Sequence, residues 1–311
     1  MAASLNVLRR YIWLIDTIKS AGRITLEDIN RKWEKSNLNE KNILRPGEKS
    51  FPKRTFFNQK QEIEKYLGIK IECNRSDNTY SITEDSENVG SPFLSWLLNS
   101  LSIYNRFANN EKLAERIILE KIPGGQHLIP AILDAISRNK KIRFNYVSFY
   151  ENKRFARLVS PYGLKQWRQR WYLLYTTDDN KEISVCALER ISELNILENE
   201  PFILDKKLDL RKHFRNVIGV NVDTSNYDPE KVIVRIYGNQ RKYFESVPLH
   251  ESQKRIRQEN EFSDYEFFIL PEYEFLHTIL QQGENAEIIS PLWLREEIKV
   301  KLQNLINLYK E

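Results

Sequence analysis

Apolar residues recur at helical spacing in three segments near the start of the chain. Residues 5–19 place leucine and isoleucine on one helix face, and residues 26–33 and 51–67 repeat apolar positions with the same period. Thr25 stands before the second segment as an N-cap, and Gly68 follows the third segment, where glycine commonly ends a helix. This pattern predicts three short helices.

Apolar and polar residues alternate after the third predicted helix. Ile69, Ile71 and Cys73 alternate before a polar turn at 74–78, and the alternation resumes at Tyr80. The alternation predicts a short β-hairpin. Three helices followed by a hairpin are typical of a winged helix-turn-helix, a fold whose third helix enters the major groove of DNA.

The outward face of the third predicted helix carries side chains that can read DNA. Lys53 and Arg54 have donors for phosphate or guanine. Asn58 and Gln61 match the N6 and N7 edge of adenine. The alternative is that these residues are only the solvated side of an amphipathic helix. The residues that we expect to contact DNA are Lys53, Arg54, Thr55, Asn58, Gln61 and, at the tip of the hairpin, Arg75.

Helical and strand patterns follow one another in the middle of the chain. Residues 92–121 have helical spacing and many aromatic and aliphatic side chains, which implies packing against the next domain or a second copy of the chain. A short helix at 129–138 precedes five alternating segments, which predict a small, strongly bent sheet or barrel. The five segments are 141–149, 155–164, 170–177, 182–188 and 191–197.

The last third of the chain interleaves strands and helices. Alternation at 231–237 starts a third unit that continues through 241–247, and the mixture predicts a compact α+β module. Further strands are expected at 255–258, 265–270 and 286–289, and helices near 273–282 and 291–309. We therefore expect a winged helix-turn-helix at 1–86, a helical linker or dimerisation segment at 87–128, an effector domain at 129–202, and a connector with the α+β module at 203–311.

Positive charge is concentrated in two parts of the chain. Residues 1–75 hold 16 Lys and Arg against 9 Asp and Glu, within a chain of net charge +5. From Arg138 to Arg170 there are ten basic residues and one acid, Glu151. Two separate basic segments indicate two anion-binding surfaces, with chance clustering on a solvated surface as the alternative.

The central segment carries the motifs of a known family. The strand Arg170-Trp171-Tyr172-Leu173-Leu174 lies between Ser160-Pro161-Tyr162-Gly163-Leu164 upstream and Leu188-Glu189-Arg190-Ile191 downstream. This segment resembles the WYL domain, which is named for its Trp-Tyr-Leu strand. The order of the four parts, together with Arg54-Thr55-Phe56 at the start of the third helix, resembles the WYL-type transcriptional regulators of bacteria over nearly the whole chain.

The resemblance implies a fold and a function. It implies an Sm-like β-barrel at 129–200, a homodimer, and a double-stranded DNA operator as partner of the N-terminal domain. It also implies that the WYL domain senses an anionic effector, such as a nucleotide, an oligonucleotide or single-stranded DNA. The expected fold class is α+β multidomain: winged helix-turn-helix, helical linker, Sm-like small β-barrel (WYL) and C-terminal α+β module.

Arginine and tyrosine residues of the WYL segment are the candidate effector ligands. A guanidinium binds phosphate through two hydrogen bonds, and tyrosine adds stacking or a hydroxyl contact. The alternative is an internal salt-bridge network with Glu182 or Glu189. Ser184 and Cys186 stand where the family often has an arginine and an aromatic residue, which implies a less cationic or differently selective pocket. The expected effector-binding residues are Tyr146, Arg157, Arg170, Tyr172 and Arg190.

Several function classes are disfavoured by the sequence. None of the four histidines has a second His or Cys at metal-ligand spacing, and no phosphate-binding glycine loop or nucleophile motif occurs. Cys73 and Cys186 are interpreted as small buried residues. No apolar run approaches the ~18 residues of a membrane span. We expect no enzyme activity, no metal, no cofactor, no membrane partner, and a cytoplasmic location.

The sequence favours one function and leaves a second open. The first hypothesis is a homodimeric, sequence-specific DNA-binding regulator, more specifically a repressor, whose WYL domain binds an anionic effector that changes DNA affinity. The second is an accessory protein that does not regulate transcription and uses the WYL barrel to bind single-stranded nucleic acid. An inverted repeat near the promoter of its own gene would favour the regulator.

Overall fold

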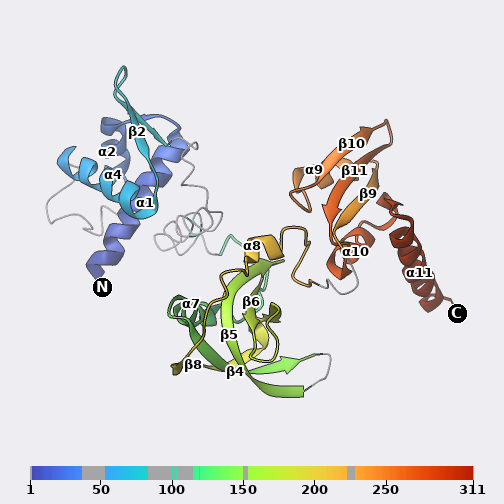
Figure 1. The fold of residues 1–311 in the computed structure, drawn as a ribbon. Helices are drawn as coiled ribbons and strands as arrows, with labels where there is room; N and C mark the ends of the chain where they lie inside the picture. Colours follow the sequence, from blue (N-terminus) through green and yellow to red (C-terminus); the bar gives the residue numbers. More distant parts are fainter. Residues whose placement is uncertain are drawn as a thin grey trace. The chain divides into compact units, whose positions relative to one another are not determined.

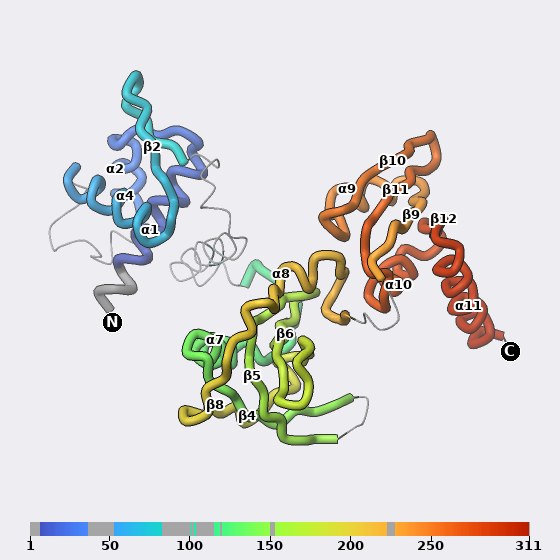
Figure 2. Tube along the Cα trace, in the orientation of Figure 1, coloured from blue at the N-terminus to red at the C-terminus, as the bar shows by residue number. Residues whose placement is uncertain are grey.

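The chain forms two compact units, residues 1–120 and residues 121–311 (Figures 1 and 2). The linker helix expected at 92–121 lies almost entirely outside the residues described by the structure. This structure is a computed structural model, and it describes residues 2–36, 53–82, 100, 103, 115–118, 120–149, 153–222 and 228–310.

The first unit packs its helices against a small antiparallel sheet. The sheet has the order β1-β3-β2, with Tyr80 opposite both Ile24 and Cys73. Thr25 caps α2 as predicted, since its Oγ1 accepts a hydrogen bond from the Asp28 backbone N–H at 3.1 Å. The elements are α1 (Ala2–Ala21), β1 (Ile24–Thr25), α2 (Leu26–Glu34), α4 (Lys53–Leu67), β2 (Ile71–Asn74) and β3 (Thr79–Ile82).

Trp33 lies at the centre of the first unit's core. It is fully buried, and its ring meets the ring of Trp13 edge-on at 4.8 Å between centroids. Phe56 and Ile63 of α4 are also fully buried in this core. Their burial fixes the rotation of α4, so the opposite face of that helix is turned to solvent.

Replacing Trp33 by alanine is expected to destabilise the first unit by about 3–5 kcal/mol, because the change removes a large buried ring and leaves a cavity. Urea unfolding followed by circular dichroism measures the free energy of unfolding. Tyr66→Ala, at an exposed position of α4, is the control and is expected to stay within about 0.5 kcal/mol of wild type. A Trp33→Ala effect as small as that of the control would contradict the assigned core.

A five-stranded antiparallel sheet forms the first part of the second unit. Its order is β7-β6-β5-β4-β8, and the 15-residue β5 pairs first with β4 and then with β6. The register shifts between Pro161 and Gly163, an irregularity that bends a strand. Among the described residues no pairing joins β7 to β8, so the ladder is open. The elements are α7 (Ile129–Ser137), β4 (Lys140–Ser148), β5 (Lys153–Trp167), β6 (Arg170–Thr176), β7 (Ser184–Ala187), η2 (Leu188–Arg190) and β8 (Ile191–Pro201).

One face of this sheet packs on α7 to form an apolar core. Phe144 of β4 and both Leu173 and Tyr175 of β6 are almost completely buried there, together with Ile132 of α7. Strand alternation turns the intervening residues to the other face. The face that packs on α7 is the core face of the sheet, and the opposite face is the outer face.

The segment after β8 returns over the outer face (Figure 2). The Phe202 backbone N–H donates to the Asn139 carbonyl at 2.9 Å, and the Asp205 backbone N–H donates to the Tyr162 hydroxyl at 3.2 Å. The short α8 (Leu210–His213) then packs on β5 so closely that a Cβ on Gly163 would lie 2.6 Å from Leu210 Cδ1. A larger residue at that position of β5 would have to displace the Leu210 side chain.

The C-terminal part of the second unit is an α+β module, as expected. Its strands have the order β10-β11-β9-β12, all antiparallel, and the βαββαβ sequence of elements is ferredoxin-like. The segment expected to continue the unit at 241–247 is mainly helix. The elements are β9 (Glu230–Tyr237), α9 (Gln240–Ser246), β10 (Lys254–Gln258), β11 (Phe262–Ile269), α10 (Tyr273–Leu280), β12 (Ala286–Ser290) and α11 (Leu292–Leu308).

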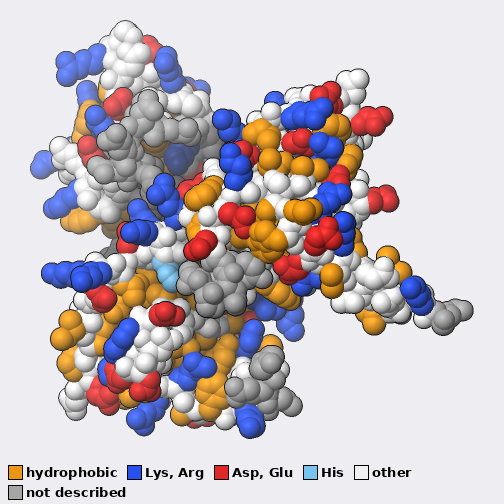
Figure 3. Space-filling model, turned by 45° about the vertical axis from the view of Figure 1, so that its right-hand side comes forward, with side chains coloured by type: hydrophobic (Ala, Val, Ile, Leu, Met, Phe, Trp, Pro, Cys, Tyr) orange, Lys and Arg blue, Asp and Glu red, His pale blue; other side chains and the backbone are white. Residues whose placement is uncertain are grey.

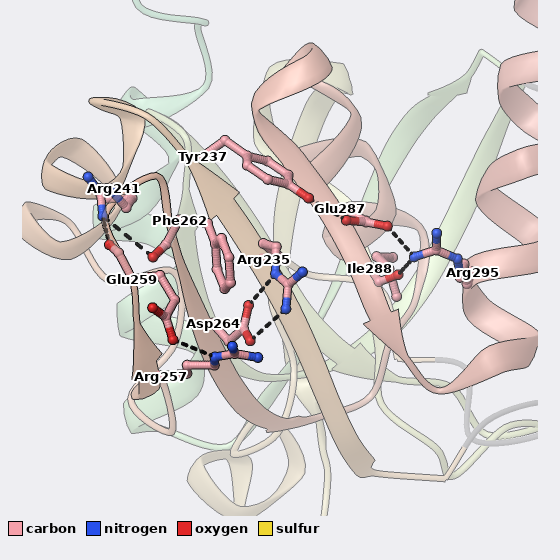
Figure 4. A network of polar contacts seen from close by, with 10 residues as sticks. All are labelled: Arg235, Tyr237, Arg241, Arg257, Glu259, Phe262, Asp264, Glu287, Ile288 and Arg295. Carbon is pink, nitrogen blue, oxygen red and sulfur yellow. Dashed lines mark hydrogen bonds and ion pairs between the residues drawn. The ribbon is translucent and has the colours of Figure 1, made fainter.

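A network of ion pairs covers one face of the C-terminal sheet (Figure 4). Arg235 pairs with both carboxylate oxygens of Asp264, at 2.7 and 3.0 Å, and its Cζ lies 3.9 Å from the centroid of Phe262. Arg235, Arg257 and Arg295 have carboxylate partners and Arg241 donates to backbone carbonyls, so the network joins the strands and α11 rather than presenting free charge. Further pairs join Arg257 to Glu259, and Glu287 to Tyr237 and Arg295.

The C-terminal helix α11 packs on its module only near its start. Leu294 is fully buried, whereas Leu305, Leu308 and Tyr309 are 49%, 81% and 83% exposed. Figure 3 shows hydrophobic side chains at the surface of this helix. Together with α10 and β12, α11 borders a groove of about 610 Å³ with a largely apolar lining.

Candidate functional site: an arginine and tyrosine cluster and the exposed face of α4

Arg157 on β5 lies against three aromatic rings. Its Cζ lies 4.8 Å from the centroid of Phe155, 5.5 Å from that of Tyr146 and 5.7 Å from that of Tyr175. Its Nη1 also donates a hydrogen bond to the Tyr175 hydroxyl. The register places Phe144 opposite Arg157 and Tyr146 opposite Phe155, so the guanidinium sits on the core face. Rings and hydrogen bond together fix the orientation of the guanidinium.

Arg190 approaches the same tyrosine from the end of η2. Its Cζ lies 6.0 Å from the centroid of Tyr146 and 4.2 Å from that of Phe149. Tyr146 is thus shared by Arg157 and Arg190. The Nε–H groups of both arginines are buried and have no hydrogen-bond acceptor within the described part of the chain. Because buried donors are normally paired, these two groups favour an acceptor supplied from outside the chain.

Arg170 and Tyr172 gather around Glu189 rather than around Tyr146. Arg170 Nη1 lies 3.6 Å from Glu189 Oε1, and the Glu189 side chain is only 17% exposed. Burial raises the pKa of Tyr172, and the nearby Arg170 partly offsets that rise. The salt bridge expected as the alternative therefore exists for Arg170, with Glu189 as the acid. The structure divides the five expected effector residues into two adjoining groups that meet at Glu189 and Arg190.

Burial keeps the phenol and thiol groups of the cluster neutral. It raises the pKa of Tyr146, and it raises those of Tyr175 and Cys186 to about 12 each. Near neutral pH these groups carry no charge, which leaves the guanidinium groups and Glu189 as the charges of this cluster. Cys186 is buried as expected and has no thiolate character.

Cys73 does not follow the expectation of burial. It is exposed, although Ile71, two residues earlier on the same strand, is buried. β2 is an edge strand of the sheet, and the core covers the cross-strand partner Tyr80 on the central strand rather than Cys73. Alternation alone does not indicate where the core stops.

The expected DNA-contacting residues share the solvent side of α4. Lys53, Arg54, Asn58 and Gln61 are exposed, and Thr55 is half-buried. Their side of the helix lies opposite the buried residues of the core. Arg75 is exposed in the turn between β2 and β3. The residues on α4 thus form one accessible polar surface.

Four aromatic residues of these two surfaces were not among the expected site residues. Phe155, Tyr175 and Phe149 contact the two central arginines, and Phe57 on α4 is 39% exposed. The period of two along a strand signals Phe155, because it stands two positions before Arg157. Tyr175 and Phe149 depend on contacts between distant segments, for which the local pattern has no signal.

The comparisons with known proteins identify the domain that contains the arginine cluster. Residues 127–196 match the family described as the WYL domain. These residues form a WYL domain. The match includes all five expected effector residues and extends from the segment before α7 into β8. The Trp-Tyr-Leu strand of this WYL domain is β6, which carries Tyr172 and Tyr175.

Two solved structures show weaker similarity to the whole chain. Proteasome accessory factor B/C (PafBC) of Arthrobacter aurescens is 16% identical with a TM-score of 0.34, over 97% of this chain and 46% of that chain. A CRISPR Cas-related protein is 13% identical with a TM-score of 0.38, over 99% of this chain and 83% of that chain. The chain thus spans less than half the length of the PafBC structure. No curated protein sequence matches the chain.

No helix within the described residues is both long and apolar enough to cross a membrane. In the same part of the chain, no group of three or more His, Cys, Asp or Glu side chains is arranged to hold a metal ion.

Proposed function

We propose that this chain is a homodimeric, sequence-specific DNA-binding regulator, and more specifically a repressor, whose WYL domain binds an anionic nucleotide or oligonucleotide. The observation that carries the proposal is the pair of half-buried arginines beside Tyr146, each with a buried Nε–H that lacks an acceptor in the described part of the chain. Phosphate oxygens are acceptors that match a guanidinium fork. The same proposal includes a winged helix-turn-helix at 1–86 and an Sm-like arrangement of the strongly bent WYL sheet.

Aromatic rings beside the arginines favour a ligand that carries bases as well as phosphate. Phe149 is 68% exposed and its ring centroid lies 4.2 Å from Arg190 Cζ, and single-stranded nucleic acid binds by stacking bases on such rings between cationic contacts. Glu189 opposes negative charge at the Arg170 end, so the phosphate is expected near Arg157 and Arg190. A nucleotide or a short single strand satisfies both conditions.

DNA recognition is assigned to the exposed face of α4. Arg54 and Lys53 supply contacts to phosphate or guanine, and Asn58 and Gln61 supply contacts to adenine. Two copies of the chain would bind two half-sites of an inverted repeat. Effector binding at the WYL domain would then change the fit of the dimer to DNA, and a coupling of about 1–3 kcal/mol gives roughly 5- to 150-fold regulation.

The test of the proposal is a competition between duplex and effector. The full chain is bound to duplex from upstream of its own gene, and mononucleotides and short single strands are titrated in. A change of duplex affinity by about fivefold or more supports effector control. Single-strand binding that leaves duplex affinity unchanged would favour the accessory protein. Light scattering that gives the mass of one chain at working concentration would contradict the homodimer.

A further inference from the structure

A cleft of about 590 Å³ lies between the outer face of the WYL sheet and the segment after β8. It is distinct from the arginine cluster. Arg157 and Ser160 are three positions apart on β5, before the register shift at Pro161, so their side chains point to opposite faces. Ser160 borders the cleft, whereas Arg157 lies on the core face. The volume is within the range of small-molecule sites.

Three polar side chains form a row across the sheet side of this cleft. Ser160 on β5 pairs directly with Thr176 on β6. Ile142 pairs with Val159, so Lys141 on β4 lies opposite Ser160 one position further along the ladder. Side chains opposite each other in antiparallel strands have Cβ atoms about 4.5–5.5 Å apart. The row therefore presents one ammonium group and two hydroxyl groups to the same small volume.

The two hydroxyl groups of the row have no hydrogen-bond partner in the described part of the chain. Ser160 is 6% exposed and Thr176 is 5% exposed, so both side chains are almost completely covered. Both nevertheless border the cleft. What remains exposed of these two side chains faces the cleft, so their hydroxyl groups are available to donate hydrogen bonds to a molecule bound there.

Lys141 is held beside this row by a carboxylate. Its Nζ lies 2.7 and 2.9 Å from the two carboxylate oxygens of Asp178, and its side chain is 16% exposed. These contacts lower the pKa of Asp178, so the pair is ionic at neutral pH. Lys181 Nζ lies 3.9 Å from the same carboxylate. An incoming oxyanion can thus replace Asp178 on Lys141 while Asp178 remains beside Lys181.

Aromatic and apolar side chains from β5 and from the covering segment also line the cleft, beside the charged residues Asp205 and Lys206. The rings of Tyr162 and Phe202 lie 5.6 Å apart between centroids, and Leu204 also borders the cleft. The hydrogen bond from the Asp205 backbone N–H to the Tyr162 hydroxyl holds this segment over the sheet. The cleft therefore combines an oxyanion-binding row with a surface for an apolar or aromatic group.

We propose that this cleft binds a small molecule in which a carboxylate or phosphate group is joined to an apolar or aromatic body. The oxyanion accepts hydrogen bonds from Lys141, Ser160 and Thr176 and replaces Asp178 on the ammonium group. The body packs against Tyr162 and Phe202. The site is independent of nucleic-acid binding at the arginine cluster, and its occupation holds the segment that leads to α8 against the WYL sheet.

Calorimetry on the full chain tests the proposal with three probes that each carry a phenyl ring. Phenyl phosphate and 3-phenylpropionate carry the two oxyanions, and 3-phenyl-1-propanol is the uncharged control. We expect the better anion to bind at least about tenfold more tightly than the alcohol, and its identity distinguishes phosphate from carboxylate as the ligand class. Equal binding of all three probes, or no binding of either anion up to about 10 mM, would overturn the proposal.

Variants assign the binding to this cleft. The Ser160→Ala and Thr176→Val double variant is expected to bind the better anion at least about tenfold more weakly. Ser184→Ala removes a hydroxyl of the same sheet outside the cleft and should have no effect. Asp178→Asn removes the competing carboxylate and is expected to tighten binding about two- to fivefold. A folded double variant with wild-type affinity, or binding lost in Arg157→Ala, would refute the cleft as the site.

Discussion

Replacing Arg157 by alanine is expected to weaken binding of a single-stranded oligonucleotide by at least about thirtyfold. Truncation of a buried charged partner costs about 2–5 kcal/mol. The change also removes the contacts of the guanidinium with Phe155, Tyr146 and Tyr175. Duplex binding without effector is expected to stay unchanged, because α4 belongs to the other unit. Anisotropy of a labelled oligonucleotide, with and without duplex, measures both quantities.

Arg154→Ala is the matched control for this variant. Arg154 stands three positions before Arg157 on β5, so it faces the other side of the sheet, where it bonds Ser192 at 2.6 Å and Glu193 at 3.1 Å. Its loss removes the same charge from an exposed pair and should change oligonucleotide affinity less than about twofold. Equal losses in both variants would mean that net charge alone attracts the strand. A wild-type affinity for Arg157→Ala would remove Arg157 from the effector site.

Replacing Arg54 by alanine is expected to weaken binding to the specific duplex by about 5- to 150-fold, the effect of losing one base-directed arginine contact. Arg54 is exposed on α4, and the unit's core lies on the opposite side of the helix, so the variant should unfold like wild type. If Arg54 contacts guanine, discrimination against a changed base pair is lost. If it contacts phosphate, all duplexes are weakened and the salt dependence falls by about one ion.

Arg255→Ala is the control for the Arg54 prediction. Arg255 is an exposed arginine of β10 in the other unit and pairs with Glu245 at 2.6 Å. Its loss changes the net charge by the same amount, so it separates a local contact from general attraction to DNA. We expect its duplex affinity to stay within about twofold of wild type. Unchanged duplex binding by a folded Arg54→Ala variant would exclude Arg54 from the interface.

Periodicity in the sequence predicts much of the local structure. The apolar positions around Trp33 and Phe56 predict helices that the structure contains, and Thr25 caps α2 as expected. The alternation that predicts five strands in the central segment works for the same reason. The strands contribute one face to the core that α7 shares, so their apolar residues are two positions apart.

Periodicity in the sequence does not predict contacts between distant segments. Tyr175 reaches Arg157 because β6 pairs with β5, and the choice between effector contact and salt bridge for Arg170 depends on where η2 places Glu189. Cys73 is exposed on the edge strand β2, although its cross-strand partner Tyr80 belongs to the core. The expected linker at 87–128 is mostly outside the described residues, so its role in dimerisation stays a prediction.

The cleft on the outer face likewise depends on contacts that the sequence pattern does not predict. Ser160 and Thr176 are ordinary strand hydroxyl residues in the sequence, 16 positions apart. They become neighbours only through the register of β5 and β6, and they are covered only because the segment at Phe202 folds back over the sheet. Sequence motifs identify the WYL domain, but they do not identify this second surface.

Specific duplex binding is the central claim, and fluorescence anisotropy across a salt series tests it most directly. The full chain is titrated with duplex from immediately upstream of its gene, with a scrambled duplex and with a short single strand. If the chain is a specific regulator, we expect it to bind the upstream duplex with nanomolar affinity, at least ~10³ tighter than its affinity for the scrambled duplex. Equal binding to all three, falling steeply with salt, would contradict a specific regulator and would indicate only electrostatic attraction.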